Sequence, residues 1–176
     1  MEKQSSEKKP LSRQRLFYLW CALAAALVAA DQWIKLLIVE HFRYGEGIPI
    51  TSFFNLVRVH NTGAAFSMLA DAGGWQHWLF ASIAIVVAVI ILFMLHKHSQ
   101  ERIFSLALSC ILGGAIGNLI DRLMHGYVVD YLDFYWKMYH FPAFNLADTA
   151  ITVGVGLIIL NELLNISKKK KANASH

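Results

Sequence analysis

Four long apolar stretches divide the chain, and each is long enough to cross a membrane as a helix. About 20 mainly apolar residues, at a rise of about 1.5 Å per residue, span the hydrocarbon core of a bilayer. Two of the stretches contain uncharged runs, at 72–96 and 103–120. The pattern predicts an all-α membrane protein, a four-transmembrane-helix bundle. The expected spans are residues 16–36, 75–95, 103–123 and 146–166.

The two connections at 37–74 and 124–145 differ in character. Residues 48–66 are rich in strand-forming residues and are interrupted by turn signals at Pro49 and at Asn61-Thr62-Gly63, so a small β-sheet is expected there. The second connection is rich in Tyr, Trp and Phe, a composition typical of the interface between membrane and water. We expect it to form a surface helix or loop.

Composition supports a single membrane-embedded domain over residues 1–176. Apolar residues make up 56% of the chain and charged residues 16%, whereas a soluble domain carries about 25% charge. A water-soluble enzyme is therefore excluded. The net charge of +4 comes from the two ends of the chain, residues 1–15 and 167–176, rather than from a patch, so no nucleic-acid partner is expected.

The positions of the basic residues predict the orientation in the membrane. With both tails cytoplasmic, 11 Lys and Arg residues flank the cytoplasmic ends of the spans and five lie on the other side. Both termini are therefore expected in the cytoplasm, and the longer connections on the periplasmic side. The first stretch also resembles a cleavable signal peptide ending at Val28-Ala29-Ala30, but the apolar run resumes at Trp33, which favours a retained span.

Polar residues gather near the outer end of the third stretch. Gly114, Asn118 and Arg122 repeat at intervals of four and share one helix face, with Asp121 beside them. Ionisable residues at membrane depth are costly, so each is a candidate for function or for pairing. The glycine is typical of close helix packing, and Asp121 with Arg122 is equally compatible with an ion pair at the helix end.

Two further polar groups occur at the same membrane depth. Asn145 and Asp148 begin the fourth stretch on one helix face, where they are also typical of an N-cap and a first-turn acid. Asp31 and Lys35 are four residues apart in the first stretch, the spacing of an ion pair within a helix. At the outer end of that stretch, they would also form a polar scaffold beneath a site.

Asp130 and Asp148 are a candidate catalytic pair, because different segments deliver them to one depth. Neighbouring carboxylates share a proton, so that one accepts a proton from water while the other donates to the carbonyl oxygen of a peptide bond. The outer histidines show no metal-binding spacing, and no metal or organic cofactor is expected. A small proton-coupled transporter is the alternative, since membrane carboxylates also relay protons.

Taken together, these segments closely resemble lipoprotein signal peptidase, also called signal peptidase II, an aspartic peptidase of bacterial membranes. The resemblance extends from Leu16 to Ile166. It rests on five motifs in this order: Asp31-Gln32-x-x-Lys35, Asn61-Thr62-Gly63-Ala64-Ala65-Phe66, Gly113-Gly114-x-x-Gly117-Asn118-x-x-Asp121-Arg122, Val128-Val129-Asp130 and Phe144-Asn145-x-Ala147-Asp148.

The resemblance implies an enzyme of the bacterial inner membrane with its active site near the periplasmic face. Such an enzyme removes the signal peptide of prolipoproteins after a diacylglyceryl group is attached to the lipobox cysteine, and it cuts on the N-terminal side of that cysteine. Membrane lipids surround it, globomycin-type inhibitors occupy its cleft, and no cofactor is implied. By motif match, the catalytic pair is Asp130 and Asp148, the substrate-positioning residues are Asn61, Asn118, Arg122 and Asn145, and the supporting residues are Asp31, Lys35, Asp121 and Gly114.

Overall fold

The computed structural model describes residues 11–63 and 75–174. Ala64, Ala65 and Phe66 of the second motif lie outside the described residues. The elements, in chain order, are α1 (Arg13–His41), β1 (Gly47–Thr51), β2 (Phe54–Asn61), α2 (Gln76–His98), α3 (Arg102–His125), β3 (Val128–Trp136), β4 (Tyr139–His140) and α4 (Leu146–Ala174).

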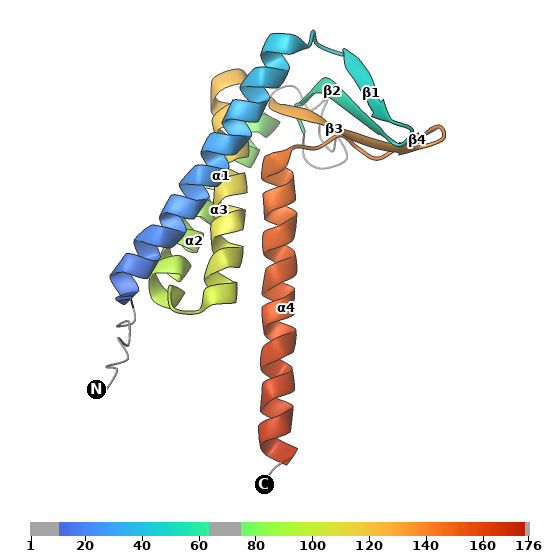
Figure 1. Ribbon diagram of the computed structural model, residues 1–176. Helices are drawn as coiled ribbons and strands as arrows, with labels where there is room; N and C mark the ends of the chain where they lie inside the picture. The colour runs from blue at the N-terminus through green and yellow to red at the C-terminus, as the bar shows by residue number, and fades with distance from the viewer. Residues whose placement is uncertain (1–10, 64–74, 175–176) are drawn as a thin grey trace, which may run out of the picture.

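The four helices are each long and apolar enough to span a membrane, which confirms the expected bundle. Helices α1 and α4 each have 29 residues. Helix α1 extends beyond its predicted span at both ends, and α4 extends beyond its span at the C-terminal end. In Figure 1 the helices run side by side, with the sheet at one end of the bundle. The chain is therefore a multi-pass membrane protein.

Helix α3 lies at the centre of the bundle and packs against the other three helices. Half of its apolar window is buried, against 22% or less in each of the others. Close approach requires glycine at three positions of α3, Gly113, Gly114 and Gly117, and the last two lie nearest the polar residues. A Cβ on Gly114 would collide with the Ala147 carbonyl oxygen of α4, and one on Gly117 would lie 2.6 Å from Oδ2 of Asp31 in α1. Both glycines bring the polar ends of neighbouring helices together.

The strands form one antiparallel sheet in the order β1-β2-β3-β4. The expected sheet in residues 48–66 is confirmed by β1 and β2. The aromatic connection differs from the expected surface helix or loop, because much of it forms β3 and β4. The reason is tertiary: β3 pairs with β2 over a long sequence separation, with Val59 opposite Asp130. Alternate residues Val129 and Tyr131 are buried against Ile38 of α1.

Candidate active site

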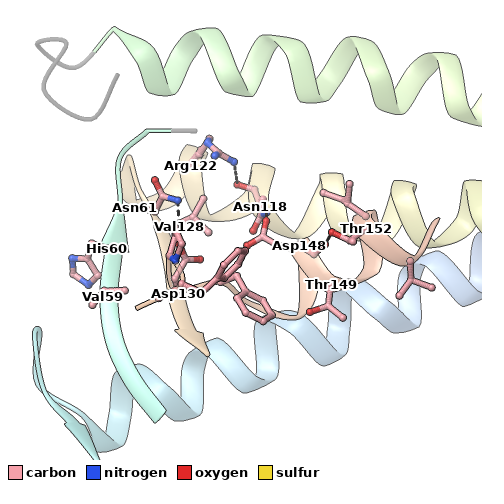
Figure 2. Close-up of a pocket in the computed structure, with 16 residues that line it drawn as sticks. Val59, His60, Asn61, Asn118, Arg122, Val128, Asp130, Asp148, Thr149 and Thr152 are labelled. Carbon is pink, nitrogen blue, oxygen red and sulfur yellow. Dashed lines mark hydrogen bonds between the residues drawn. The ribbon is translucent and has the colours of Figure 1, made fainter. Parts of the chain in front are cut away.

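A cavity of about 680 Å³ lies where α3, α4, β2 and β3 meet. Its walls are mainly apolar, with contributions from Phe141, Phe144, Ile151 and Val153. Figure 2 shows the polar side chains gathered at one side of this cavity. Five of them belong to the sequence motifs, namely Asn61, Asn118, Arg122, Asp130 and Asp148, and His60, Thr149 and Thr152 also line the cavity.

Asp130 lies in the third position of β3 and is 2% exposed. Each of its carboxylate oxygens accepts a hydrogen bond from an amide. Asn145 Nδ2 donates to Oδ1 at 2.7 Å, and Asn61 Nδ2 of β2 donates to Oδ2 at 3.1 Å. The pairing of β2 with β3 therefore places one of the two donors, and the start of α4 supplies the other.

Asp148 occupies the first turn of α4, where the chain forms a reciprocal cap. The backbone N–H of Asp148 donates to Asn145 Oδ1 at 2.9 Å, while Asp148 Oδ2 accepts from the backbone N–H of Asn145 at 3.2 Å. This arrangement is a capping box, which satisfies backbone donors at a helix start. The expected N-cap and first-turn acid are thus confirmed, and the cap also fixes the carboxylate of Asp148.

Asn145 joins the two acids through a single side chain. Its amide oxygen binds the backbone of Asp148 and its amide nitrogen binds the carboxylate of Asp130. The side chain is fully buried, and a buried amide must have its donors and acceptor satisfied. One amide group therefore sets the position of β3 relative to the start of α4.

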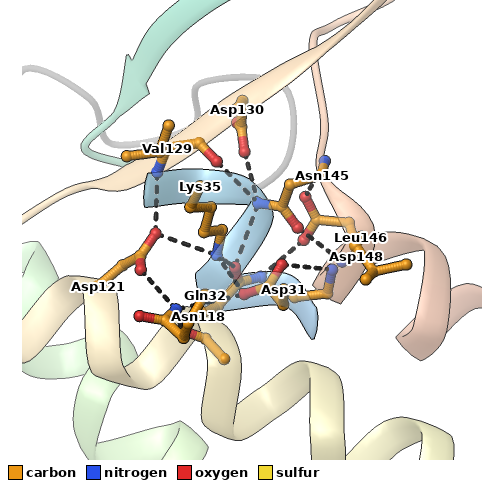
Figure 3. Close-up of polar contacts among 12 residues, drawn as sticks. Asp31, Gln32, Lys35, Asn118, Asp121, Val129, Asp130, Asn145, Leu146 and Asp148 are labelled. Atoms are coloured by element: carbon orange, nitrogen blue, oxygen red, sulfur yellow. Dashed lines mark hydrogen bonds and ion pairs between the residues drawn. The ribbon is translucent and has the colours of Figure 1, made fainter. Parts of the chain in front are cut away.

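Beneath the two acids lies a buried polar network centred on Lys35 (Figure 3). The Lys35 ammonium contacts Asp31 Oδ2 at 2.8 Å, Asp121 Oδ2 at 3.0 Å and Asn118 Oδ1 at 3.0 Å. These three acceptors match the three hydrogens of the ammonium group. The ion pair expected between Asp31 and Lys35 is confirmed.

The two acids of this network, Asp31 and Asp121, also hold backbone groups of α4 and β3, the elements that carry Asp148 and Asp130. Asp31 Oδ1 accepts from the backbone N–H of Ala147 in α4 at 3.0 Å, and Asp121 Oδ2 accepts from the backbone N–H of Val129 in β3 at 3.0 Å. Val129 and Ala147 each precede one of the candidate catalytic acids in the sequence. Helices α1 and α3 therefore position Asp130 and Asp148 through the backbone.

Arg122 was expected either to position substrate or to form an ion pair with Asp121 at the helix end, and the described part of the structure does not show the ion pair. Within the described ranges it forms no ion pair with Asp121, which pairs with Lys35 instead. Its guanidinium donates to the carbonyl oxygens of Asn118 and Gly63, both at 3.3 Å, and lies 5.4 Å from the ring centroid of Phe80 in α2. The alternative of an ion pair at the helix end is wrong, because Lys35 reaches Asp121 from the neighbouring helix.

Three residues without an expected role also support the site. Gln32 Nε2 donates to Asp121 Oδ1 at 2.9 Å, the Tyr131 hydroxyl accepts from the backbone N–H of Leu146 at 3.0 Å, and Phe80 lies beside Arg122. Gln32 had a detectable signal, as an amide in an apolar span. Tyr131 and Phe80 had none, because aromatic residues are ordinary in this composition.

Burial changes the proton affinity of Asp130. The pKa of its carboxyl group is raised from 3.8 to about 7, mainly by loss of water on burial and also by the negative charge of Asp148. The hydrogen bonds from Asn61 and Asn145 oppose this shift. Asp130 is thus able to hold a proton near neutral pH, as a general acid requires.

The site offers carboxylate, amide, guanidinium and ammonium groups. In the part of the chain that the structure describes, no three His, Cys, Asp or Glu side chains gather as a metal ion would need. The chemistry that these groups support is proton transfer between a buried acid, a second carboxylate and a molecule in the cavity.

Comparisons with known proteins agree with the sequence motifs. Residues 23–164 match the family model described as signal peptidase (SPase) II. The chain is 55% identical over 150 residues to the lipoprotein signal peptidase of Cupriavidus necator, covering 85% of this chain and 86% of that protein. It is 49% identical over 149 residues to the lipoprotein signal peptidase of Ralstonia nicotianae, covering 85% and 86%.

A solved structure described as a bacterial membrane enzyme obtained by the in meso method is also similar. It has 32% sequence identity and a TM-score of 0.77, and the alignment covers 86% of this chain and 91% of that one. A second structure with the same description has a TM-score of 0.72 at 32% identity, covering 82% and 92%. The helices and the sheet are thus arranged as in a known membrane enzyme.

Proposed function

Because the chain belongs to the signal peptidase II family, we propose that it removes signal peptides from prolipoproteins with Asp130 and Asp148 as its catalytic pair. The substrate is a prolipoprotein whose lipobox cysteine carries a diacylglyceryl group, and the bond cut is on the N-terminal side of that cysteine. The observation that carries the proposal is the bridge formed by Asn145, which holds both acids at the edge of a largely apolar cavity.

The two carboxyl groups share one proton in the resting enzyme. Asp130 carries it, since burial and the charge of Asp148 keep its pKa near 7. Asp148 is the ionised member and accepts a proton from water as the water oxygen attacks the peptide carbonyl carbon. Asp130 donates its proton to the carbonyl oxygen, which gives a neutral tetrahedral intermediate.

Collapse of the intermediate returns both protons. Asp148 donates the proton it received to the leaving nitrogen, and the carbon–nitrogen bond breaks. Asp130 takes back a proton from one hydroxyl group as the carbonyl re-forms. The products are a carboxylic acid on the signal peptide and a free amine on the lipid-modified cysteine, and the pair is ready for another cycle.

The polar residues around the pair divide into two groups. Asn118 and Asn145 are buried and donate directly to the acids, so we assign them to orienting Asp148 and Asp130. Asn61 also donates to Asp130 but is more exposed. Asn61 and Arg122 are only half-buried and line the cavity, which suits contacts to an extended substrate backbone. Globomycin-type inhibitors would occupy the same cavity.

The proposed orientation puts the active site at the periplasmic face of the inner membrane and both termini in the cytoplasm. The excess of Lys and Arg on the opposite side of the bundle supports it. A prolipoprotein anchored by its acyl chains would then meet the acids at the depth where α4 begins. Family membership and the gathering of the acids at one end of the bundle favour this role over that of a proton-coupled transporter.

Cleavage of a purified, diacylglyceryl-modified prolipoprotein tests the proposal. Asp130→Asn and Asp148→Asn should each lower the cleavage rate by at least about 100-fold, a typical contribution of general acid–base groups. Asp133→Asn is the matched control. Asp133 lies on the same strand but bonds to Asn55 and His140 outside the main cavity, so this variant should keep most of its activity.

Two results would overturn the proposal. Normal turnover by either folded variant would show that Asp130 and Asp148 are not the catalytic pair. Mass spectrometry of the product should find the lipid-modified cysteine as its first residue. A different first residue in the product would contradict the proposed cleavage site. Equal cleavage of a precursor without the diacylglyceryl group would contradict the proposed substrate.

A further inference from the structure

The end of the sheet farthest from the helices carries a group of exposed side chains that the catalytic site does not use. We call it the sheet tip and define it as Phe53, Trp136, Lys137, Met138 and Tyr139. Trp136 is 75% exposed, Met138 91% and Tyr139 80%. None of the five lines the cavity that contains the two acids.

The sheet tip is built from two adjacent turns. Trp136 pairs with Tyr139 across the β3–β4 hairpin, so Lys137 and Met138 form its two-residue turn. Phe53 belongs to the turn between β1 and β2, and its carbonyl oxygen accepts from the backbone N–H of Tyr135 at 2.9 Å. Sheet pairing therefore fixes all five side chains at one end of the sheet.

The residues in this hairpin turn are unusual for a turn facing water. Two-residue hairpin turns favour Gly, Asn and Asp, because backbone angles with positive φ are required there. Here Lys137 adopts a φ of 57°, a conformation that costs free energy for a residue with a Cβ. The chain thus places a long basic side chain and an exposed Met at positions where small polar residues are more stable.

The height of the sheet tip relative to the helices indicates what it contacts. In Figure 1 the sheet extends sideways past α4, and its far end is level with the first turn of α4 and well below the sheet-side end of α1. Helix α4, which is long and apolar enough to span a membrane, begins with that turn at Leu146. The sheet tip therefore lies level with the start of a helix that is apolar enough to span the membrane.

The chemistry of the sheet tip fits the lipid headgroup region. Trp and Tyr concentrate at membrane interfaces, where an apolar ring and a polar edge are both satisfied. Lys137 Nζ lies 5.5 Å from the ring centroid of Trp136, so a cation accompanies the aromatic ring. A lysine at this depth reaches phosphate groups while its methylene chain stays among the lipids.

We propose that the sheet tip is a membrane anchor, which inserts Trp136, Met138 and Tyr139 into the headgroup region of the leaflet on the sheet's side of the bilayer. Its partner is the lipid surface, with Lys137 against lipid phosphates. Strands β2 and β3 carry Asn61 and Asp130, so the anchor holds these residues at a constant depth in the membrane. The inference depends on membrane geometry and not on the proposed catalytic steps.

Site-directed spin labelling of the full chain in lipid nanodiscs tests this anchor. The background is Cys21→Ala with Cys110→Ala, which removes both cysteines of the sequence. A nitroxide is then attached at Met138→Cys, and its collisions with oxygen, which concentrates in lipid, and with a water-soluble nickel chelate are compared. The nanodiscs contain phosphatidylcholine and phosphatidylglycerol.

Two labelled positions provide matched controls. Arg43→Cys lies in the exposed connection after α1, at the end of the bundle, and should give the low oxygen-to-nickel ratio of water. Val89→Cys lies on α2, where the native side chain is 62% exposed, and should give the high ratio of hydrocarbon. The ratio at Met138→Cys should lie clearly above the Arg43→Cys value and below the Val89→Cys value.

A ratio at Met138→Cys equal to that at Arg43→Cys would overturn the anchor. If the ratio at Met138→Cys equalled that at Arg43→Cys and decreased further on addition of a prolipoprotein, the sheet tip would contact the substrate polypeptide and not the lipid. Each labelled variant must retain the thermal unfolding temperature of the cysteine-free parent, so a misfolded variant is recognised before its ratio is interpreted. If the native chain failed to cleave a prolipoprotein while Met138→Cys kept its intermediate ratio, the anchor would stand and the proposed function would not.

Discussion

Lys35 of α1 determines which way the amide of Asn118 in α3 points. The ammonium group of Lys35 only donates, so the atom of Asn118 that faces it at 3.0 Å must be the amide oxygen. The amide nitrogen is thereby directed to Asp148 Oδ1, at 2.8 Å. A charge outside the cavity thus orients a donor inside it.

Replacing Lys35 should destabilise the fold strongly. Lys35→Met leaves Asp31 and Asp121 buried, charged and without their cation, and breaking a buried ion pair in this way costs about 3–5 kcal/mol. Thermal unfolding in detergent measures the loss. Adding Asp31→Asn to Lys35→Met removes one uncompensated charge and should recover part of the stability. An unchanged unfolding temperature in Lys35→Met would show that the network carries little stabilisation.

Asn145→Ser should separate helix capping from control of Asp130. Serine is a good N-cap, so the start of α4 should lose less stability than in Asn145→Ala, where loss of the cap costs about 0.5–2 kcal/mol. Both variants lose the donor to Asp130, which in the native enzyme lowers the pKa of that acid. The pH at which activity declines on the alkaline side should therefore move upward in both variants. A pH–rate profile that keeps the native alkaline limb in Asn145→Ser would contradict this role.

Asp130 should make the protein less stable as the pH rises from about 4 to about 7. Its pKa in the folded state is about 7, compared with 3.8 for the free carboxyl group, so the folded state binds more protons across that window. Stability then falls with rising pH, by up to about 4 kcal/mol from this one group. The measurement is the unfolding temperature at pH 5 and pH 8 in one detergent.

Asp130→Asn should flatten this dependence of stability on pH. The variant should gain most stability relative to the native protein at pH 8, where the native carboxylate is charged and buried. Asp133→Asn, on the same strand, is the control and should retain the native slope from Asp130. A slope in Asp130→Asn as steep as in the native protein would assign the pH dependence to other groups.

Gly114→Ala should disturb the placement of Asp148. The added methyl group would collide with the Ala147 carbonyl oxygen and with Ile151 Cγ1, so α4 must move away from α3. Overpacking of this kind costs about 1–3 kcal/mol. The cleavage rate should fall as well, because the first turn of α4 carries Asp148, one of the two proposed catalytic acids.

The matched control is Gly156→Ala on the same helix as Asp148, where an added Cβ would meet no atom within 4 Å. That variant should be as stable and active as the native protein. Equal activity and stability for Gly114→Ala would show that the two helices have room to separate without moving Asp148.

Much of the site was predictable because its residues carry local signals. Asp31 and Lys35 have the spacing of an ion pair within a helix, and Asn145 with Asp148 has the pattern of a capped helix start. A charge or amide at membrane depth is costly enough to stand out against an apolar background. These signals identified the residues without identifying all of their partners.

The partners were decided by packing between helices and between distant strands. Asp121 pairs with Lys35 of α1 and not with Arg122 beside it, because Gly117 lets α1 approach α3 closely. The aromatic segment after α3 forms β3 because its backbone pairs with β2, about 70 residues earlier in the chain. No local propensity reveals a pairing between such distant segments.

By itself, then, the sequence determined the four membrane spans, the small sheet after α1 and which two acids are the candidates for a catalytic pair. Hydrophobic run length and the cost of buried charge are properties of local composition. Only the tertiary structure decided that Asn145 joins Asp130 to Asp148, that Lys35 orients Asn118, and that the sheet tip lies level with the start of α4. Hydrogen bonds and membrane depth depend on distances between atoms of different elements, and those distances exist only after the helices and strands have packed.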